Sequence, residues 1–136
     1  MGDSIDALRE QMKPLLPGLL GLELLEATQE RVTGRLTVRP ELCTIGGVLH
    51  GGAIMAFSDT LGAVATLMNL PPSARTTTIE SKTNFLGGAS AGALVLAETT
   101  ALHRGKTTMV WQTQVKAESG KLLAIVIQTQ LVLAPR

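Results

Sequence analysis

Residues 31–38 alternate between apolar or small residues and polar ones, a period of two that predicts a β-strand. The run 22–28 before them is also strand-like, and the two runs predict a hairpin that turns near Gln29 and Glu30. After residue 74 the chain is rich in strand-forming residues, and turns containing glycine divide it into the runs 75–85, 93–103, 107–118 and 122–133.

One long segment, from about His50 or Gly51 to Asn69, breaks this pattern. Its residues are apolar or small on nearly every face, which predicts a helix surrounded by protein, and two prolines close it. A short amphipathic helix is expected over residues 4–13, with Ser4 as its N-cap. The order helix, two strands, long helix, four strands excludes alternating βαβ units. We therefore expect an α+β fold, an antiparallel sheet of about five to six strands wrapped around one long buried helix.

The chain has 136 residues, which fits one domain over residues 1–136. Its formal net charge is +1 and its basic residues are scattered, so nucleic acid is not an expected partner. The single cysteine, Cys43, cannot form an internal disulfide, and no signal peptide is recognised, so a cytoplasmic location is expected. No apolar run of about 18 residues free of interruption occurs, so membrane association is not expected either.

The segment from Gly46 to Gly52 runs directly into the long helix, which carries Asp59. The N-terminus of a helix presents unpaired backbone N–H groups, and glycines there allow another group to approach closely. Such an end can polarise a carbonyl oxygen. Asp59 lies in the apolar run 57–67, where an unpaired carboxylate is costly to bury. A carboxylate in such a cleft can act as nucleophile or general base.

Gly51 and Asp59 are eight residues apart, which separates them by roughly 12 Å along one helix. Both cannot touch one carbonyl group. If both serve one active site, one of them comes from a second copy of the chain, with antiparallel helices related by a two-fold axis. The geometry therefore predicts a dimer at least.

Residues 46–59 resemble the signature of hotdog-fold thioesterases of the phenylacetate-pathway and 4-hydroxybenzoyl-CoA thioesterase kind. The order of elements over residues 21–133 agrees with that family. The resemblance implies hydrolysis of acyl-CoA to free acid and CoA, with a catalytic carboxylate at Asp59 and a thioester carbonyl held by the N–H of the partner's Gly51. It further implies that His50 shapes the loop, that no separate cofactor is needed, and that the enzyme is a homotetramer.

Further positions carry the same resemblance. Thr78 matches a hydroxyl near the carboxylate that orients water or substrate, and Thr44 and Gly52 are candidate substrate contacts. Thr44 stands six residues before His50, where family members commonly have Asn or Gln. The turn from His103 to Thr107 resembles one that meets the CoA phosphates, which assigns Arg104, Lys106 and Thr107 to CoA binding.

Other interpretations of these residues stay open. Asp59 and His50 can be structural hydrogen-bonding groups, Gly51 and Gly52 can merely permit close packing, and the basic residues near 105 can simply be solvated. Alternative functions are a non-catalytic acyl-CoA binding module, or a hydratase or dehydratase of the same fold. The pattern from Gly88 to Gly92 resembles a serine nucleophile elbow but precedes a strand. With two distant histidines and one cysteine, no metal site is expected, and the acyl group is undetermined.

Overall fold

The computed structural model describes residues 2–136, with side chains from Ile5 onward. Two short helices, α1 (Gly2–Met12) and α2 (Leu16–Leu20), precede the hairpin of β1 (Glu23–Ala27) and β2 (Arg31–Thr37). A 3-10 turn, η1 (Pro40–Leu42), and a loop lead into α3 (Gly51–Leu67). The four remaining strands are β3 (Arg75–Phe85), β4 (Leu94–Arg104), β5 (Thr108–Ala117) and β6 (Leu122–Leu133).

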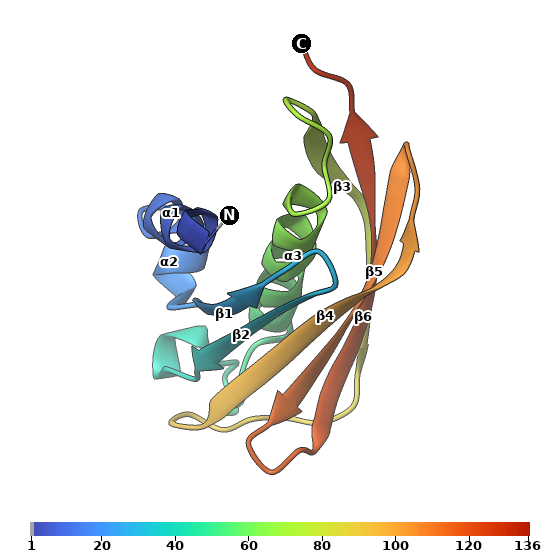
Figure 1. Ribbon diagram of the computed structural model, residues 1–136. Coiled ribbons are helices and arrows are strands. Elements are labelled where there is room, and N and C mark those ends of the chain that lie inside the picture. Colours follow the sequence, from blue (N-terminus) through green and yellow to red (C-terminus); the bar gives the residue numbers. More distant parts are fainter. Residues whose placement is uncertain (1) are drawn as a thin grey trace.

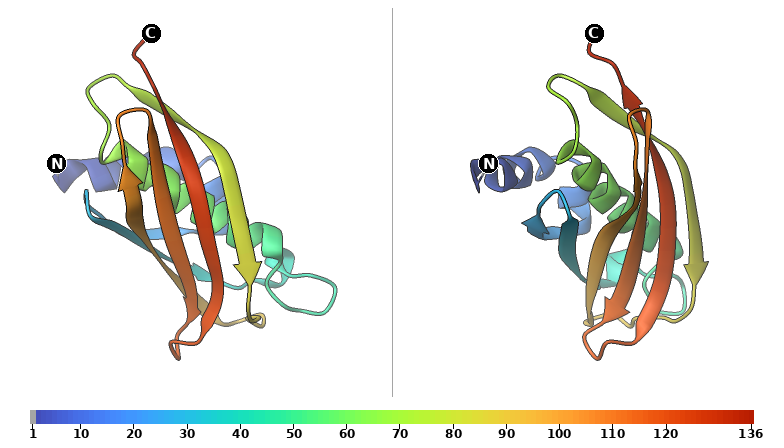
Figure 2. Two further views of the ribbon diagram at one scale, coloured as in Figure 1. Left: turned by 90° about the vertical axis from the view of Figure 1, so that its right-hand side faces the viewer. Right: turned by 45° about the vertical axis from the view of Figure 1, so that its right-hand side comes forward.

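All six strands form one antiparallel sheet in the order β1-β2-β4-β5-β6-β3. The sheet curves around α3, while α1 and α2 lie on the other side of α3 from β5 and β6 (Figures 1 and 2). Strand β3 follows α3 in the chain but pairs with β6, the last strand, so residues near position 80 lie beside residues near position 129. The predicted hotdog fold is confirmed.

The face of α3 that meets the sheet is buried and apolar, with Phe57 and Leu61 fully buried. Trp111 of β5 is also fully buried, and its indole N–H donates to the hydroxyl of Thr66 on α3 over 2.9 Å. Other positions of α3 are less covered by this chain: Gly52 is exposed, Asp59 is half-buried and Leu67 is 45% exposed. A single chain therefore leaves these positions of the long helix partly uncovered.

The N-terminal region differs from its prediction in two ways. The first helix begins at Gly2 and ends at Met12, so it does not run over 4–13, and Ser4 lies inside it and not at its N-cap. The second helix, α2, was not predicted, because a five-residue turn containing Pro17 and Gly18 has no helical periodicity to detect. Among the described residues, no helix has the length and apolar character needed to cross a membrane.

The two edge strands of the sheet, β1 and β3, differ in length and in how far they are covered. On β1, the carbonyl oxygens of Leu24 and Leu25 accept hydrogen bonds from the guanidinium of Arg9, over 2.9 and 3.4 Å. Strand β1 has 5 residues, whereas β3, at the other edge, has 11. The β3 edge carries the exposed side chains of Ile79 and Phe85. A short, covered edge resists pairing with another chain, and a long uncovered edge favours it.

Candidate active site

Asp59 lies in the middle of α3, on the side that faces strands β3 and β6, and its carboxylate accepts two hydrogen bonds. The hydroxyl of Thr78 on β3 donates to Oδ1 over 2.7 Å, and the side-chain amide of Gln128 on β6 donates to the same oxygen over 2.9 Å. No hydrogen bond to Oδ2 is found within residues 2–136. Two donors therefore hold one carboxylate oxygen and leave the other free.

The network extends one step further from Asp59. The amide of Gln130 donates to the hydroxyl of Thr78 over 2.6 Å, and the hydroxyl of Thr76 lies 2.9 Å from the amide oxygen of Gln130. The antiparallel pairing of β3 with β6 places these side chains together, since Thr78 is the register partner of Gln130. A register shift between Thr78 and Glu80 follows directly, so the strand is irregular beside the carboxylate.

The N-terminus of α3 forms the second part of the predicted site. His50 is the N-cap: its backbone is extended, and its Nδ1 accepts a hydrogen bond from the N–H of Gly52 over 2.7 Å. Gly51, as the first helical residue, has no acceptor for its N–H within the helix, and none is found elsewhere in the described chain. The cap therefore uses the N–H of Gly52 and leaves the N–H of Gly51 free to polarise a carbonyl.

An aromatic ring covers Gly51. A Cβ atom at this position would lie 3.0 Å from the Phe85 ring, which is tight contact, so the bare backbone of Gly51 packs directly against the ring. Phe85 is itself 52% exposed, whereas the other two aromatic residues, Phe57 and Trp111, are fully buried. The amide that is free to bind an oxygen thus lies beside an exposed apolar surface.

Thr44 lies in the loop before α3, where its N–H donates to the carbonyl of Val48 over 2.7 Å and its own carbonyl accepts from Gly47 over 3.0 Å. Gly47 has a φ of 78°, in the left-handed region that glycine adopts without strain. Thr44 and His50 both line an open surface groove of about 470 Å³. Ile45 in the same groove is fully exposed, with a relative exposure of 109%.

The structure brings some of the predicted residues together and separates others. Thr78 contacts Asp59, and Thr44, His50, Gly51 and Gly52 gather around the N-terminus of α3. These two groups are eight residues apart along one helix, roughly 12 Å, because Asp59 and Gly51 lie on the same α3. In one chain, the Asp59 carboxylate and the Gly51 N–H therefore lie at different places on α3.

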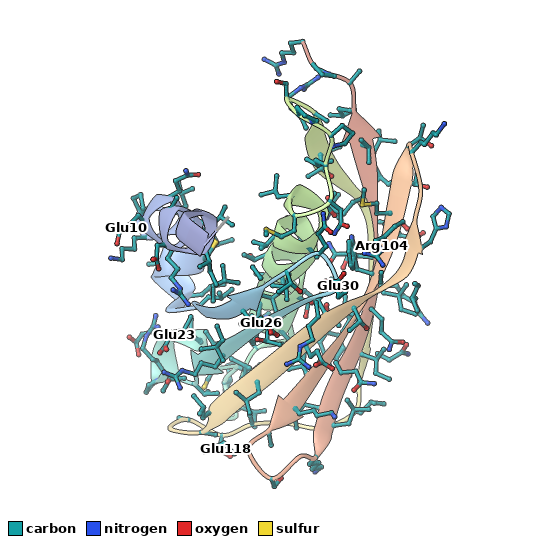
Figure 3. All side chains as sticks on the ribbon, viewed as in Figure 1. Glu10, Glu23, Glu26, Glu30, Arg104 and Glu118 are labelled. Atoms are coloured by element: carbon teal, nitrogen blue, oxygen red, sulfur yellow. The ribbon has the colours of Figure 1, made fainter. Side chains whose placement is uncertain are left out.

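The turn between β4 and β5 lies at the C-terminal end of α3, away from Gly51 (Figure 1). Arg104 contacts the β1–β2 turn, because its guanidinium donates to the carbonyl of Gln29 over 3.1 Å and to the Asn69 side chain over 3.4 Å. Figure 3 shows Arg104 close to Glu30 of the same turn. Lys106 and Thr107 are exposed. In a single chain these three residues do not lie near Gly51.

Four residues of the site were missed by the sequence analysis: Gln128, Gln130, Thr76 and Phe85. The available signal was in the last strand, where amides occupy alternate positions, Gln128 and Gln130, and the segments on both sides of 128–130 are apolar. Both are buried, at 1% and 0% exposure. Within the described residues, no group of three or more His, Cys, Asp or Glu side chains is placed to hold a metal ion.

A carboxylate and a free helix N-terminal amide are groups that can act on a carbonyl compound. The sequence model of the thioesterase superfamily matches residues 46–124. The chain is 28% identical to a 1,4-dihydroxy-2-naphthoyl-CoA hydrolase of Listeria monocytogenes over 106 residues, which cover 78% of this chain and 85% of that protein.

Two solved structures are also similar. A mutant thioesterase of Pseudomonas aeruginosa has a TM-score of 0.89 and 28% identity, covering 94% of this chain and 92% of that one. A thioesterase of Haemophilus influenzae has a TM-score of 0.87 and 25% identity, covering 93% and 87%. The chain belongs to the thioesterase superfamily, and it is a thioester hydrolase.

Proposed function

We propose that this enzyme hydrolyses acyl-CoA thioesters at a site shared by two subunits, with Asp59 of one subunit and the backbone N–H of Gly51 of the partner subunit. The observation that carries the proposal is the state of the Asp59 carboxylate, whose Oδ1 is held by Thr78 and Gln128 while Oδ2 has no hydrogen bond within residues 2–136. The name of the Listeria relative, a hydrolase of a CoA thioester, supports CoA as the thiol part of the substrate.

The chemistry uses two groups of the protein. The free N–H of Gly51, at the positive end of the α3 dipole, donates to the thioester oxygen, which becomes more negative as the carbonyl carbon is attacked. The free Oδ2 of Asp59 either attacks that carbon directly or takes a proton from a water molecule that attacks it. The C–S bond then breaks, and CoA leaves as a thiolate that takes up a proton. The direct route forms a mixed anhydride, which water hydrolyses to the free acid.

A dimer is required because Gly51 and Asp59 of one chain are roughly 12 Å apart. The uncovered edge of β3 lies next to the partly covered positions of α3 around Asp59, because Thr78 of β3 donates to the Asp59 carboxylate. Pairing of two such surfaces about a two-fold axis makes the two α3 helices antiparallel, so that each Gly51 approaches the partner's Asp59. The exposed Ile45, Ile79 and Phe85 side chains would become buried in such an interface.

The same arrangement gives the β4–β5 turn a role. In an antiparallel pair of α3 helices, the C-terminal end of one helix lies toward the N-terminal end of the other, so Lys106 and Thr107 of one subunit approach the Gly51 loop of its partner. Cationic and hydroxyl groups there suit the phosphates of CoA. Arg104, Thr44 and Gly52 are proposed as further substrate contacts, and the assembly is proposed to be a homotetramer of two such dimers acting in the cytoplasm. No separate cofactor is proposed.

The test is a thiol-release assay of the purified enzyme against aryl, short, medium and long acyl-CoAs, with Asp59→Asn assayed in parallel. The Asn side chain keeps the size of Asp and can still accept from Thr78, but it is neither a nucleophile nor a base. We expect thiol release from at least one class of acyl-CoA and a loss of about a thousandfold or more in kcat in the variant. An Asn variant with near wild-type kcat would show that Asp59 is not catalytic.

A further inference from the structure

The two oxygens of the Asp59 carboxylate are not equivalent. Oδ1 accepts from Thr78 and from Gln128, over 2.7 and 2.9 Å, whereas Oδ2 accepts from no group in residues 2–136. The two donors come from different strands, β3 and β6, which are paired with each other. Their combined effect is to fix the rotation of the carboxylate about its Cβ–Cγ bond and so to determine which oxygen points away from the protein's own donors.

Gln130 leaves the proton of the Thr78 hydroxyl free for the bond to Asp59. A threonine hydroxyl has one proton to donate, and a carboxylate only accepts. The amide N–H of Gln130 lies 2.6 Å from the Thr78 oxygen and supplies a proton to it, so the hydroxyl keeps its own proton for Asp59. The hydroxyl of Thr76 lies 2.9 Å from the amide oxygen of Gln130 and 3.0 Å from the carbonyl of Leu131, so its single proton is shared between these two acceptors.

Packing of the sheet does not require amide side chains at Gln128 and Gln130. On the same inner face of β6, the preceding positions are Ala124 and Val126, both fully buried and apolar. The amides that continue this row are 1% and 0% exposed, and the Oε1 of Gln128 has no partner in the described chain. A buried amide with an unpaired oxygen costs stability. An apolar side chain would serve packing better at this position.

Gly62 makes the position of Gln128 possible. It lies three residues after Asp59 on α3, and a Cβ atom there would collide with the side-chain amide of Gln128. Glycine within a helix costs roughly 1 kcal/mol relative to alanine. Gly62 therefore destabilises α3, but it leaves the space in which the Gln128 amide lies close to the helix backbone and reaches Asp59.

We propose that Gln128 and Gln130 are positioning residues for thioester hydrolysis: Gln128 by its direct bond to Oδ1 of Asp59, and Gln130 by directing the Thr78 hydroxyl, so that Oδ2 is the reacting oxygen. Gly62 provides the space that Gln128 needs. This inference rests on the proposed role of Asp59.

The experiment measures kcat and KM of Gln128→Met, Gln130→Met, Thr78→Val and the double variant Thr78→Val/Gln130→Met. Methionine is close in size to glutamine and is compatible with a buried position. We expect Gln128→Met to lower kcat about 10- to 100-fold with KM changed less than about twofold, since a hydrogen bond to a charged group is lost. Gln130→Met lowers kcat about 3- to 10-fold in the wild-type background.

The double variant separates positioning from a general structural role. Because Gln130 acts through the Thr78 hydroxyl, Gln130→Met should lower kcat by less than about twofold further when Thr78 is already Val. Thr113→Val is the matched control: Thr113 is a buried hydroxyl on the neighbouring strand, bonded to Thr99 over 2.6 Å and not part of this network. Its substitution should change Tm and leave kcat within twofold of wild type.

Asp59→Asn, assayed in the same series, distinguishes two kinds of failure. If that variant is inactive while both glutamine variants keep kcat within twofold of wild type, the positioning role is wrong and the proposed function stands. If Gln130→Met lowers kcat equally in both backgrounds, its role is structural and the inference is also wrong. If Asp59→Asn retains turnover, the proposed function fails and the inference falls with it. Should Gln128→Met not fold, Gln130→Met and its double variant test the inference alone.

Discussion

The two halves of the site differ in how complete they are within one chain. Around Asp59, hydrogen bonds from Thr78 and Gln128 hold one oxygen, and the supporting Gln130 is fully buried. Around Gly51, the helical N–H has no partner in the described chain, and the surroundings include the exposed side chains of Ile45 and Phe85. The carboxylate half is therefore held by donors of its own chain, whereas the amide half is open.

This difference separates the contacts that form when one chain folds from those that wait for a substrate and a second chain. Buried polar groups such as the N–H of the Gln128 amide, which donates to Asp59, find their partners during folding, because they are costly without them. A backbone N–H at an open helix N-terminus can stay solvated until a substrate arrives. In the proposed site, one chain therefore positions the reacting oxygen of Asp59, and the N–H of Gly51 is available to a carbonyl held by a second chain.

The largest effect among single substitutions in the open half is expected from Gly51→Pro. Proline has no N–H and is well tolerated at the first helical position, and the extended backbone of His50 suits a following proline. We expect kcat to fall about 100- to 1,000-fold, the usual loss when one donor to a developing oxyanion is removed. Gly51→Ala is the control, because it keeps the N–H and introduces a similar contact with the Phe85 ring. If Ala and Pro lower kcat equally, the N–H is not the group responsible.

In the complete half, Thr78→Val should lower kcat about 10- to 100-fold. The substitution preserves shape and removes the proton that the hydroxyl donates to Asp59. Steady-state kinetics and thermal unfolding should be measured together. A lower Tm with unchanged kcat would contradict a role for this hydroxyl at the carboxylate.

A smaller effect is expected at the β4–β5 turn, where Lys106→Ala should raise the KM for acyl-CoA several-fold and leave kcat nearly unchanged. The exposed ammonium interacts with phosphates in the proposal, so the effect should weaken with salt and disappear for an acyl-N-acetylcysteamine substrate, which has no phosphates. Lys121→Ala, at the β5–β6 turn, is the matched control. Equal effects on both substrates would exclude a phosphate contact.

The smallest effect is expected at His50, which the structure shows as a helix cap. His50→Ala should reduce the free energy of unfolding by about 1 kcal/mol, the usual loss of an N-cap, and lower kcat only a few-fold. His50→Asn, which can accept from the same Gly52 N–H, should restore both values. If Asn restores stability and not kcat, the imidazole takes part in the chemistry itself.

Much of this fold could be predicted because its patterns are local. The bounds 75–85 and 122–133 agree with β3 and β6, and the long helix lies within its predicted range. Asp59 and Gly51 stood out because a carboxylate in an apolar run, and glycines before a helix, are visible along the chain. Thr78 was assigned from the resemblance to the thioesterase family. The Thr78 hydroxyl does lie against Asp59, over 2.7 Å.

The parts that escaped prediction depend on contacts between distant segments. Gln128 and Gln130 reach Asp59 and Thr78 only because the last strand pairs with the strand after α3, in a register that the sequence does not reveal. The packing of Phe85 on Gly51 has the same origin. A polar residue in an apolar strand can be noticed from sequence, but the group that it contacts cannot.

The central claim is that one site uses Asp59 of one subunit and Gly51 of the other, and mixing two inactive variants tests it most directly. Asp59→Asn and Gly51→Pro chains are refolded together in equal amounts, and kcat is compared with that of each variant alone. Half of the dimers are mixed, and each mixed dimer has one of its two sites intact, so the account predicts recovery of about a quarter of wild-type activity. No recovery from dimers shown to be mixed would contradict it, because both residues would then act within a single chain.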